Sequence, residues 1–188
     1  MDIEKILSEN NIPKDAIIEL SGKFQAQIIK ENDFFIQYGK RMNKIGILYE
    51  GLLISRYTNN EGKEVASKFY FPKGDNLVVD YYSFINQLNS DEEIQAIENS
   101  KLLTINYDDY NFLIKEFPQL QNMIKEFAEQ SYLKALNRIR DFQLLNTKER
   151  IRKFIKTHNP IINRVMIKDK SSYLGMTRNI YTNNLTKI

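Results

Sequence analysis

The chain has 188 residues, about one and a half times a usual domain of ~100–150, so we expect one medium domain with a small appendage and exclude a large multidomain enzyme. With 42% apolar and 27% charged residues, the composition excludes a disordered or collagen-like chain. The chain has no cysteine and one histidine, His158, which excludes disulfides, thiol nucleophiles, Cys/His zinc sites and thiolate-held iron–sulfur clusters. The net charge of +3 is unevenly distributed. Residues 146–188 contain ten basic and two acidic residues, a net charge of +8, whereas the rest of the chain contains 17 basic and 22 acidic residues, a net charge of −5. This distribution predicts a polyanion-binding tail on a sensor or scaffold domain.

The first twenty residues predict short helices, one of them beginning near Pro13, behind a polar and acidic N-terminus. The longest apolar stretch of the chain, Ile45–Ile54, is interrupted by Glu50 and falls far short of the ~20 residues that span a bilayer. We therefore expect a cytoplasmic protein.

From about Phe24 to Asn106 the chain alternates short runs of β-branched and aromatic residues with turn residues. Strands at roughly 8–12 residue spacing, with no long helix between them, predict an antiparallel sandwich or barrel rather than a parallel α/β sheet. The predicted strands are Ala26–Ile29, Phe34–Gln37, Ile45–Tyr49, Leu52–Tyr57, Val65–Phe71, Ile94–Ile97 and Leu102–Asn106.

A long helix is predicted from Pro118 to about Leu145, after a short helix that begins at Asp108-Asp109. At 1.5 Å per residue it would be about 40 Å long, too long to pack fully against one small sandwich, so we expect part of it to pack against a second chain. The alternative is a single helix folded back on its own domain. The residues expected at the dimer contact are Leu120, Ile124, Phe127, Ala135 and Ile139.

The basic C-terminal segment predicts three further helices. Thr147 is expected to cap the first, Lys148–Thr157, and two short helices follow within residues 167–188. They are joined at Leu174–Thr177, where Gly175 ends one and Thr177 caps the next. This is the sequence form of a helix-turn-helix, although helix pairs are common and a solvated basic face is the alternative.

The order of these parts resembles the Crp/Fnr family of bacterial transcription regulators. Tyr49–Leu53 and Asn60–Glu64 are similar to the family's glycine-marked hairpins, and Lys148–Ile151 and Ser172–Thr177 are similar to its DNA-binding module. The resemblance implies an α+β fold: an N-terminal double-stranded β-helix (jelly roll) with flanking helices in residues 1–117, a dimerisation helix in 118–145 and a helix-turn-helix in 146–188. It implies a homodimer that binds palindromic DNA, not an enzyme.

The resemblance also implies which residues contact DNA. We expect base contacts from Arg178, Thr182 and Asn183, with Ile180, Tyr181 and Leu185 packed inward. Asn183 stands where the family has a second Arg, which implies a different and A·T-leaning site. The residues expected to contact phosphates are Lys168, Lys170, Lys187, Arg150 and Arg152.

The ligand-binding turn departs from the family pattern. Ser83-Phe84 and Ile94–Glu98 resemble the segments that bracket it, but Ser90–Glu93 contains three acids where the phosphate-binding Arg is expected, so we predict that cyclic AMP is not bound. Asp80, Tyr81, Tyr82 and Phe84 are the candidates for a pocket that takes another, unidentified effector. We expect no cofactor and no metal. The alternative function is a protein-interaction module with a vestigial helix-turn-helix that does not bind DNA.

Overall fold

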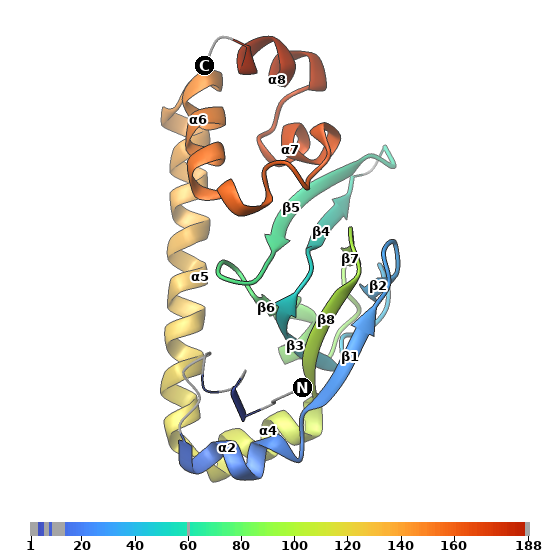
Figure 1. The fold of residues 1–188 in the computed structure, drawn as a ribbon, viewed down its shortest axis with the longest axis vertical. Helices are drawn as coiled ribbons and strands as arrows, with labels where there is room; N and C mark the ends of the chain where they lie inside the picture. Colours follow the sequence, from blue (N-terminus) through green and yellow to red (C-terminus); the bar gives the residue numbers. More distant parts are fainter. Residues whose placement is uncertain (1–3, 6–7, 9–13, 60, 187–188) are drawn as a thin grey trace. The chain divides into compact units, whose positions relative to one another are not determined.

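The computed structural model describes residues 4–5, 8, 14–59 and 61–186 (Figure 1). The helices are α2 (Lys14–Ser21), α3 (Tyr81–Asn86), α4 (Tyr107–Glu116), α5 (Pro118–Leu144), α6 (Thr147–Thr157), the short 3-10 helix η1 (Asn159–Ile161), α7 (Ile167–Tyr173) and α8 (Arg178–Leu185). The strands are β1 (Gln25–Ile29), β2 (Phe34–Ile36), β3 (Lys44–Glu50), β4 (Leu53–Thr58), β5 (Glu64–Tyr70), β6 (Leu77–Val78), β7 (Glu92–Ala96) and β8 (Ser100–Asn106).

The chain divides into two compact units. The first, here the sheet unit, contains the residues up to Ser55 together with Phe69–Ala128. The second, here the helical unit, contains Arg56–Lys68 and the residues from Glu129 onward. The sequence-based boundaries after residues 117 and 145 follow chain order, whereas the contacts group the β4–β5 turn region with the C-terminal helices. We call Arg56–Lys68 the hairpin segment.

The strands form two four-stranded antiparallel sheets, with the orders β1-β8-β3-β6 and β2-β7-β4-β5. All seven predicted strands are present, with ends that differ by one or two residues. The two-residue strand β6 was not predicted, because Leu77-Val78 is too short to show an alternating pattern.

The main core of the sheet unit contains apolar residues from all eight strands. Leu48 and Leu102 are buried in it, and their neighbours Ile47 and Leu103 lie in a second cluster. Because successive strand residues point to opposite faces, the sheet that contains β3 and β8 buries both of its faces. The second cluster is closed by α2, α4 and the first turn of α5, which contribute Ile17, Leu20, Leu113 and Leu120.

Helix boundaries follow local chemistry. The predicted break before Pro118 is confirmed: α4 ends at Glu116 and Pro118 is the first residue of α5. The predicted cap of α6 was wrong by one residue. Asn146, not Thr147, is the N-cap, because its side chain accepts from the Glu149 N–H while Glu149 accepts from the Asn146 N–H, a capping box.

Candidate nucleic-acid interface

A small apolar core organises the C-terminal helices. Helix α8 packs against α6 and α7. The buried apolar residues of this part of the chain are Ile151, Phe154, Ile161, Val165, Leu174 and Tyr181. Tyr181 is the member from α8, and it is only 1% exposed, so it anchors that helix.

The turn between α7 and α8 is built as expected. Gly175 has a φ of 66°, a left-handed conformation, and a Cβ there would lie 2.6 Å from Cε1 of Phe142. Both facts require glycine. The Thr177 side chain then accepts from the Ile180 N–H at 3.3 Å and caps α8. This confirms that Gly175 ends one helix and Thr177 begins the next.

Helix α8 exposes the three residues expected to contact bases. Arg178, Thr182 and Asn183 are all exposed. The expectation that Ile180 and Leu185 pack inward was wrong, because they are 43% and 39% exposed and Tyr181 alone is buried. Helix α8 packs against α6 and α7, and Tyr181 is the residue that it buries there.

Lys170, expected at a phosphate, is engaged within the unit. Its ammonium donates to the carbonyl of Ile162 at 2.9 Å and lies 5.9 Å from the centre of the Tyr181 ring. Burial lowers the pKa of Lys170, because desolvation disfavours the charged form. The apolar stem therefore packs between helices while the head group is satisfied by a carbonyl.

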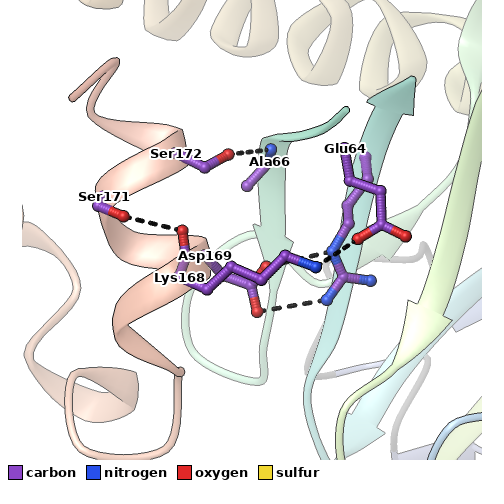
Figure 2. Close-up of polar contacts among 7 residues, drawn as sticks. Glu64, Ala66, Lys168, Asp169, Ser171 and Ser172 are labelled. Atoms are coloured by element: carbon purple, nitrogen blue, oxygen red, sulfur yellow. Dashed lines mark hydrogen bonds and ion pairs between the residues drawn. The ribbon is translucent and has the colours of Figure 1, made fainter. Parts of the chain in front are cut away.

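Lys168, also expected at a phosphate, is paired with the hairpin segment. Its Nζ lies 2.7 Å from Oε2 of Glu64 (Figure 2). The hydrogen bond from Lys168 is the main cause that lowers the pKa of Glu64, and burial opposes it. The side chains of both residues keep 40% or more of their surface exposed, so the pair is open to solvent and to competing ions.

The same face of α7 makes two more contacts with the hairpin segment. Asp169 is 2% exposed and pairs with Arg56, which is 5% exposed. Arg56 Nε lies 3.2 Å from Oδ1 and Nη2 lies 3.3 Å from Oδ2, a two-pronged arrangement. The Ser172 hydroxyl accepts from the Ala66 N–H at 2.7 Å, also visible in Figure 2. Sequence reasoning predicted none of these contacts.

Two arginines surround Phe142. Arg138 donates to the Ser67 carbonyl at 2.6 Å and to the Tyr173 carbonyl at 2.9 Å, and its guanidinium lies 4.2 Å from the Tyr173 ring centre. Arg150, expected at a phosphate, lies 5.0 Å from the Phe142 ring centre, and its buried Nε has no hydrogen-bond partner. Arg138 was not predicted.

The remaining basic candidates differ in position. Arg152 is exposed on α6, where it is free of the core. Lys187 lies outside the residues that the structure describes. Of the four expected phosphate contacts that the structure describes, Lys168, Lys170 and Arg150 pack or pair internally, whereas Arg152 is exposed.

The expected dimer residues fall into two groups along α5. Leu120 lies in the core of the sheet unit and Ile124 packs against it, which leaves neither free for a second chain. Phe127 is half-buried, and Ala135 and Ile139 are exposed. The exposed large apolar residues of the second half of the helix are Tyr132, Leu133, Leu136, Ile139, Phe142 and Leu144.

The structure does not bring the four pocket candidates together. Asp80 is buried as the N-cap of α3, where its carboxylate accepts from the Ser83 N–H and from the Ser90 hydroxyl. Phe84 is 1% exposed in the core. Tyr81 and Tyr82 are exposed. Only Asp80 therefore offers a buried polar group, and its carboxylate is already hydrogen-bonded.

Among residues 4–5, 8, 14–59 and 61–186, no cluster of three or more His, Asp or Glu residues could hold a metal ion. Within those same residues no helix is both long and apolar enough to cross a membrane.

Comparison with known proteins identifies the fold. No family model and no curated protein matches the sequence. Among solved structures, the chain is similar to the c-di-GMP-responsive global regulator CLP of Xanthomonas campestris, with a TM-score of 0.75 at 12% identity over 93% of this chain and 91% of that one. It is also similar to FixK2 of Bradyrhizobium japonicum (TM-score 0.73, 11% identity, 87% and 83% covered) and to a Crp/Fnr family transcriptional regulator of Thermus thermophilus (0.69, 14%, 87% and 84%). The chain therefore has the fold of Crp/Fnr-type transcriptional regulators.

Proposed function

We propose that this protein is a transcriptional regulator that binds palindromic double-stranded DNA as a homodimer, with α7 and α8 as a helix-turn-helix and residues 1–117 as a jelly-roll sensor domain. One observation supports it most: α8 is anchored by buried Tyr181 and exposes Arg178, Thr182 and Asn183. A recognition helix needs such an anchored but uncovered face in order to enter a major groove.

The side chains on that face suit base reading. Arg donates two parallel hydrogen bonds to guanine, Asn pairs with adenine, and Thr contacts either base. Exposed Arg152 is placed to contact a phosphate, which positions the protein without selecting a sequence. The proposed site therefore combines one guanine contact with a preference for A·T pairs.

Dimerisation is proposed through the second half of α5. Tyr132, Leu136 and Ile139 follow one another at steps of four and three residues, so they form an exposed apolar stripe along one helix face. A second copy of the same stripe would cover it in a two-fold arrangement. Two copies of α8 would then meet successive major grooves about 34 Å apart.

Loss of cyclic-nucleotide binding is proposed from α3. The carboxylate of Asp80 already accepts the Ser83 N–H at 3.1 Å, so a negative charge of the chain occupies the end of this short helix. A phosphate there would meet like charge. Isothermal calorimetry with cyclic AMP is expected to give no heat of binding, and micromolar affinity would contradict the proposal.

The rival function, an interaction module that does not bind DNA, has one observation in its favour. The ammonium groups of Lys168 and Lys170 are bound to Glu64 and to the Ile162 carbonyl. A helix pair with its lysines engaged internally has less charge to offer a phosphate backbone.

Selection of bound DNA duplexes from a random pool distinguishes the proposed regulator from the interaction module that does not bind DNA. Wild type is expected to enrich a palindrome, and Arg178→Ala is expected to lose it, with a cost of ~1–3 kcal/mol at one base position. Lys30→Ala, which removes an exposed charge from the sheet unit, is the matched control and should enrich the same site. Failure of wild type to enrich any duplex at low salt would favour the rival.

A further inference from the structure

Helix α7 is held by the hairpin segment at three points on one face. Lys168, Asp169 and Ser172 contact Glu64, Arg56 and Ala66 respectively (Figure 2). Lys168 and Ser172 are four residues apart, so the contacts follow one line along the helix. The face of α8 that exposes Arg178 takes no part in them.

The Arg56–Asp169 pair fixes the position of the hairpin segment. Both side chains are at least nine-tenths buried, so neither charge can be left without the other. The two prongs of the guanidinium also fix its orientation against the carboxylate. A buried pair of this kind has one favourable geometry, and its loss would free the part of the segment next to Arg56, while Ala66 and Ser67 keep their contacts with Ser172 and Arg138.

The Glu64–Lys168 pair has the opposite character. It is exposed, it joins single atoms, and Lys168 is a residue for which we expect a phosphate partner. A carboxylate 2.7 Å from that ammonium occupies the position a phosphate oxygen would take and repels it. Lys168 can therefore exchange the carboxylate of Glu64 for a phosphate of DNA.

We propose that the hairpin segment is an intramolecular competitor of DNA: Glu64 holds Lys168 in place of a phosphate, and the buried Arg56–Asp169 pair positions Glu64 to do so. This rests on the proposed function. Arg56 is the positioning residue. Release of Glu64 adds one phosphate contact and raises the affinity for any duplex, independent of its sequence.

The competitor is connected to the sheet unit by the chain itself. Ser55 precedes Arg56 in β4, and its hydroxyl donates to the buried carboxylate of Glu92. The Glu92 N–H donates to the Ser90 hydroxyl, which in turn donates to Asp80 at the start of α3. A change at α3 would thus reach Arg56 through three hydrogen-bonded residues and one peptide bond.

The test compares binding of one duplex by wild type, Glu64→Gln and Glu61→Gln at several salt concentrations. Glu61 is an exposed acid of the same hairpin segment, so its variant controls for the change in net charge. One added phosphate contact steepens the slope of log K against log salt by ~0.9, which corresponds to about eightfold tighter binding at 0.1 M salt. We expect this for Glu64→Gln only, and expect the gain to vanish when Lys168→Gln is added.

Each result has one meaning. If Glu64→Gln and Glu61→Gln behave alike, or if the gain survives Lys168→Gln, the competitor is disproved while DNA binding stands. If wild type and every variant fail to bind any duplex, the proposed function itself fails.

The role of Arg56 is tested in the double variant Arg56→Met/Asp169→Leu, which removes both buried charges and keeps apolar packing. Without the pair Glu64 is no longer fixed, so the gain from Glu64→Gln should fall to about twofold or less in that background, a coupling that a double-mutant cycle measures. An undiminished gain would show that Arg56 does not position Glu64.

Discussion

The two units of this chain are stabilised by different kinds of interior. The sheet unit buries apolar side chains from eight strands and four helices in two clusters. The helical unit has a small apolar core and adds to it a buried ion pair and an arginine, Arg138, that donates to two carbonyls. The sheet unit also buries the hydrogen-bonded carboxylates of Asp80 and Glu92, but the buried ion pair between Arg56 and Asp169 belongs to the helical unit.

This difference predicts that the sheet unit is a scaffold and that the helical unit responds to charged partners. Apolar burial is non-directional and insensitive to nearby charge, so the sheet unit should tolerate a changed charge or salt concentration. Ion pairs and charge-assisted hydrogen bonds have specific geometries and compete with other ions. The helical unit is therefore the one whose contacts a polyanion can rearrange.

The largest expected effect is in the sheet unit. Phe84 is 1% exposed and packs edge-on against Tyr107 and Tyr110, with ring centres 5.3 and 5.0 Å apart. Phe84→Ala should destabilise this unit by about 3–5 kcal/mol, since it leaves a cavity. Hydrogen exchange resolved by peptide should show faster opening of the strands, with residues 146–186 little changed. Phe112→Ala, an exposed aromatic of the same unit, is the control and should cost far less.

Removal of one buried charge should have the next largest effect, in the helical unit. Asp169→Ala removes the carboxylate that pairs with buried Arg56, which costs about 3 kcal/mol, at the low end for such pairs because both N–O distances exceed 3.1 Å. Hydrogen exchange of the backbone amides of α7 measures this cost. Asp141→Ala breaks the exposed pair with Lys153 and should cost under about 1 kcal/mol. Equal costs for the two would contradict the expectation that burial decides how much an ion pair of the helical unit contributes.

The sequence predicted the sheet unit better than the helical unit for a physical reason. Strand alternation and turn residues are local patterns, and so all seven runs became strands. The α7–α8 turn was equally local, because Gly175 and Thr177 have fixed conformational roles.

The contacts of α7 could not be predicted in this way. Arg56 and Asp169 are 113 positions apart, and nothing in either sequence neighbourhood marks the other as its partner. Leu120 was expected at a dimer contact because periodicity shows an apolar face without showing what covers it, and the sheet unit covers that turn. The prediction for Ile180 and Leu185 was wrong for the converse reason, since their own unit covers them only in part.

The third expected effect is a pH dependence of the sheet unit. Burial, with smaller contributions from Tyr81 and Tyr107, raises the pKa of Tyr110 from 10.0 to about 12. A folded pKa above the unfolded one gives stability that is full below pH 10 and is lost as pH rises toward 12, by about 2–3 kcal/mol. Urea unfolding at pH 9 and pH 11.5 should show this loss in wild type and a smaller one in Tyr110→Phe. Tyr38→Phe, at an exposed tyrosine, should leave the loss unchanged.

The smallest expected effect concerns the capping box of α6. Asn146→Ala removes the acceptor of the Glu149 N–H, a bond of 3.1 Å, and should destabilise the helical unit by about 1 kcal/mol. Because α8 packs against α6, fraying at Asn146 should also loosen α8, and amide exchange should rise in α8 as well as in α6. Asn137→Ala, on an exposed position of α5, removes the same side chain without a cap and should leave both helices unchanged. Faster exchange confined to α6 would mean that α8 is held by α7 alone, and that the apolar core of the helical unit is less cooperative than its packing indicates.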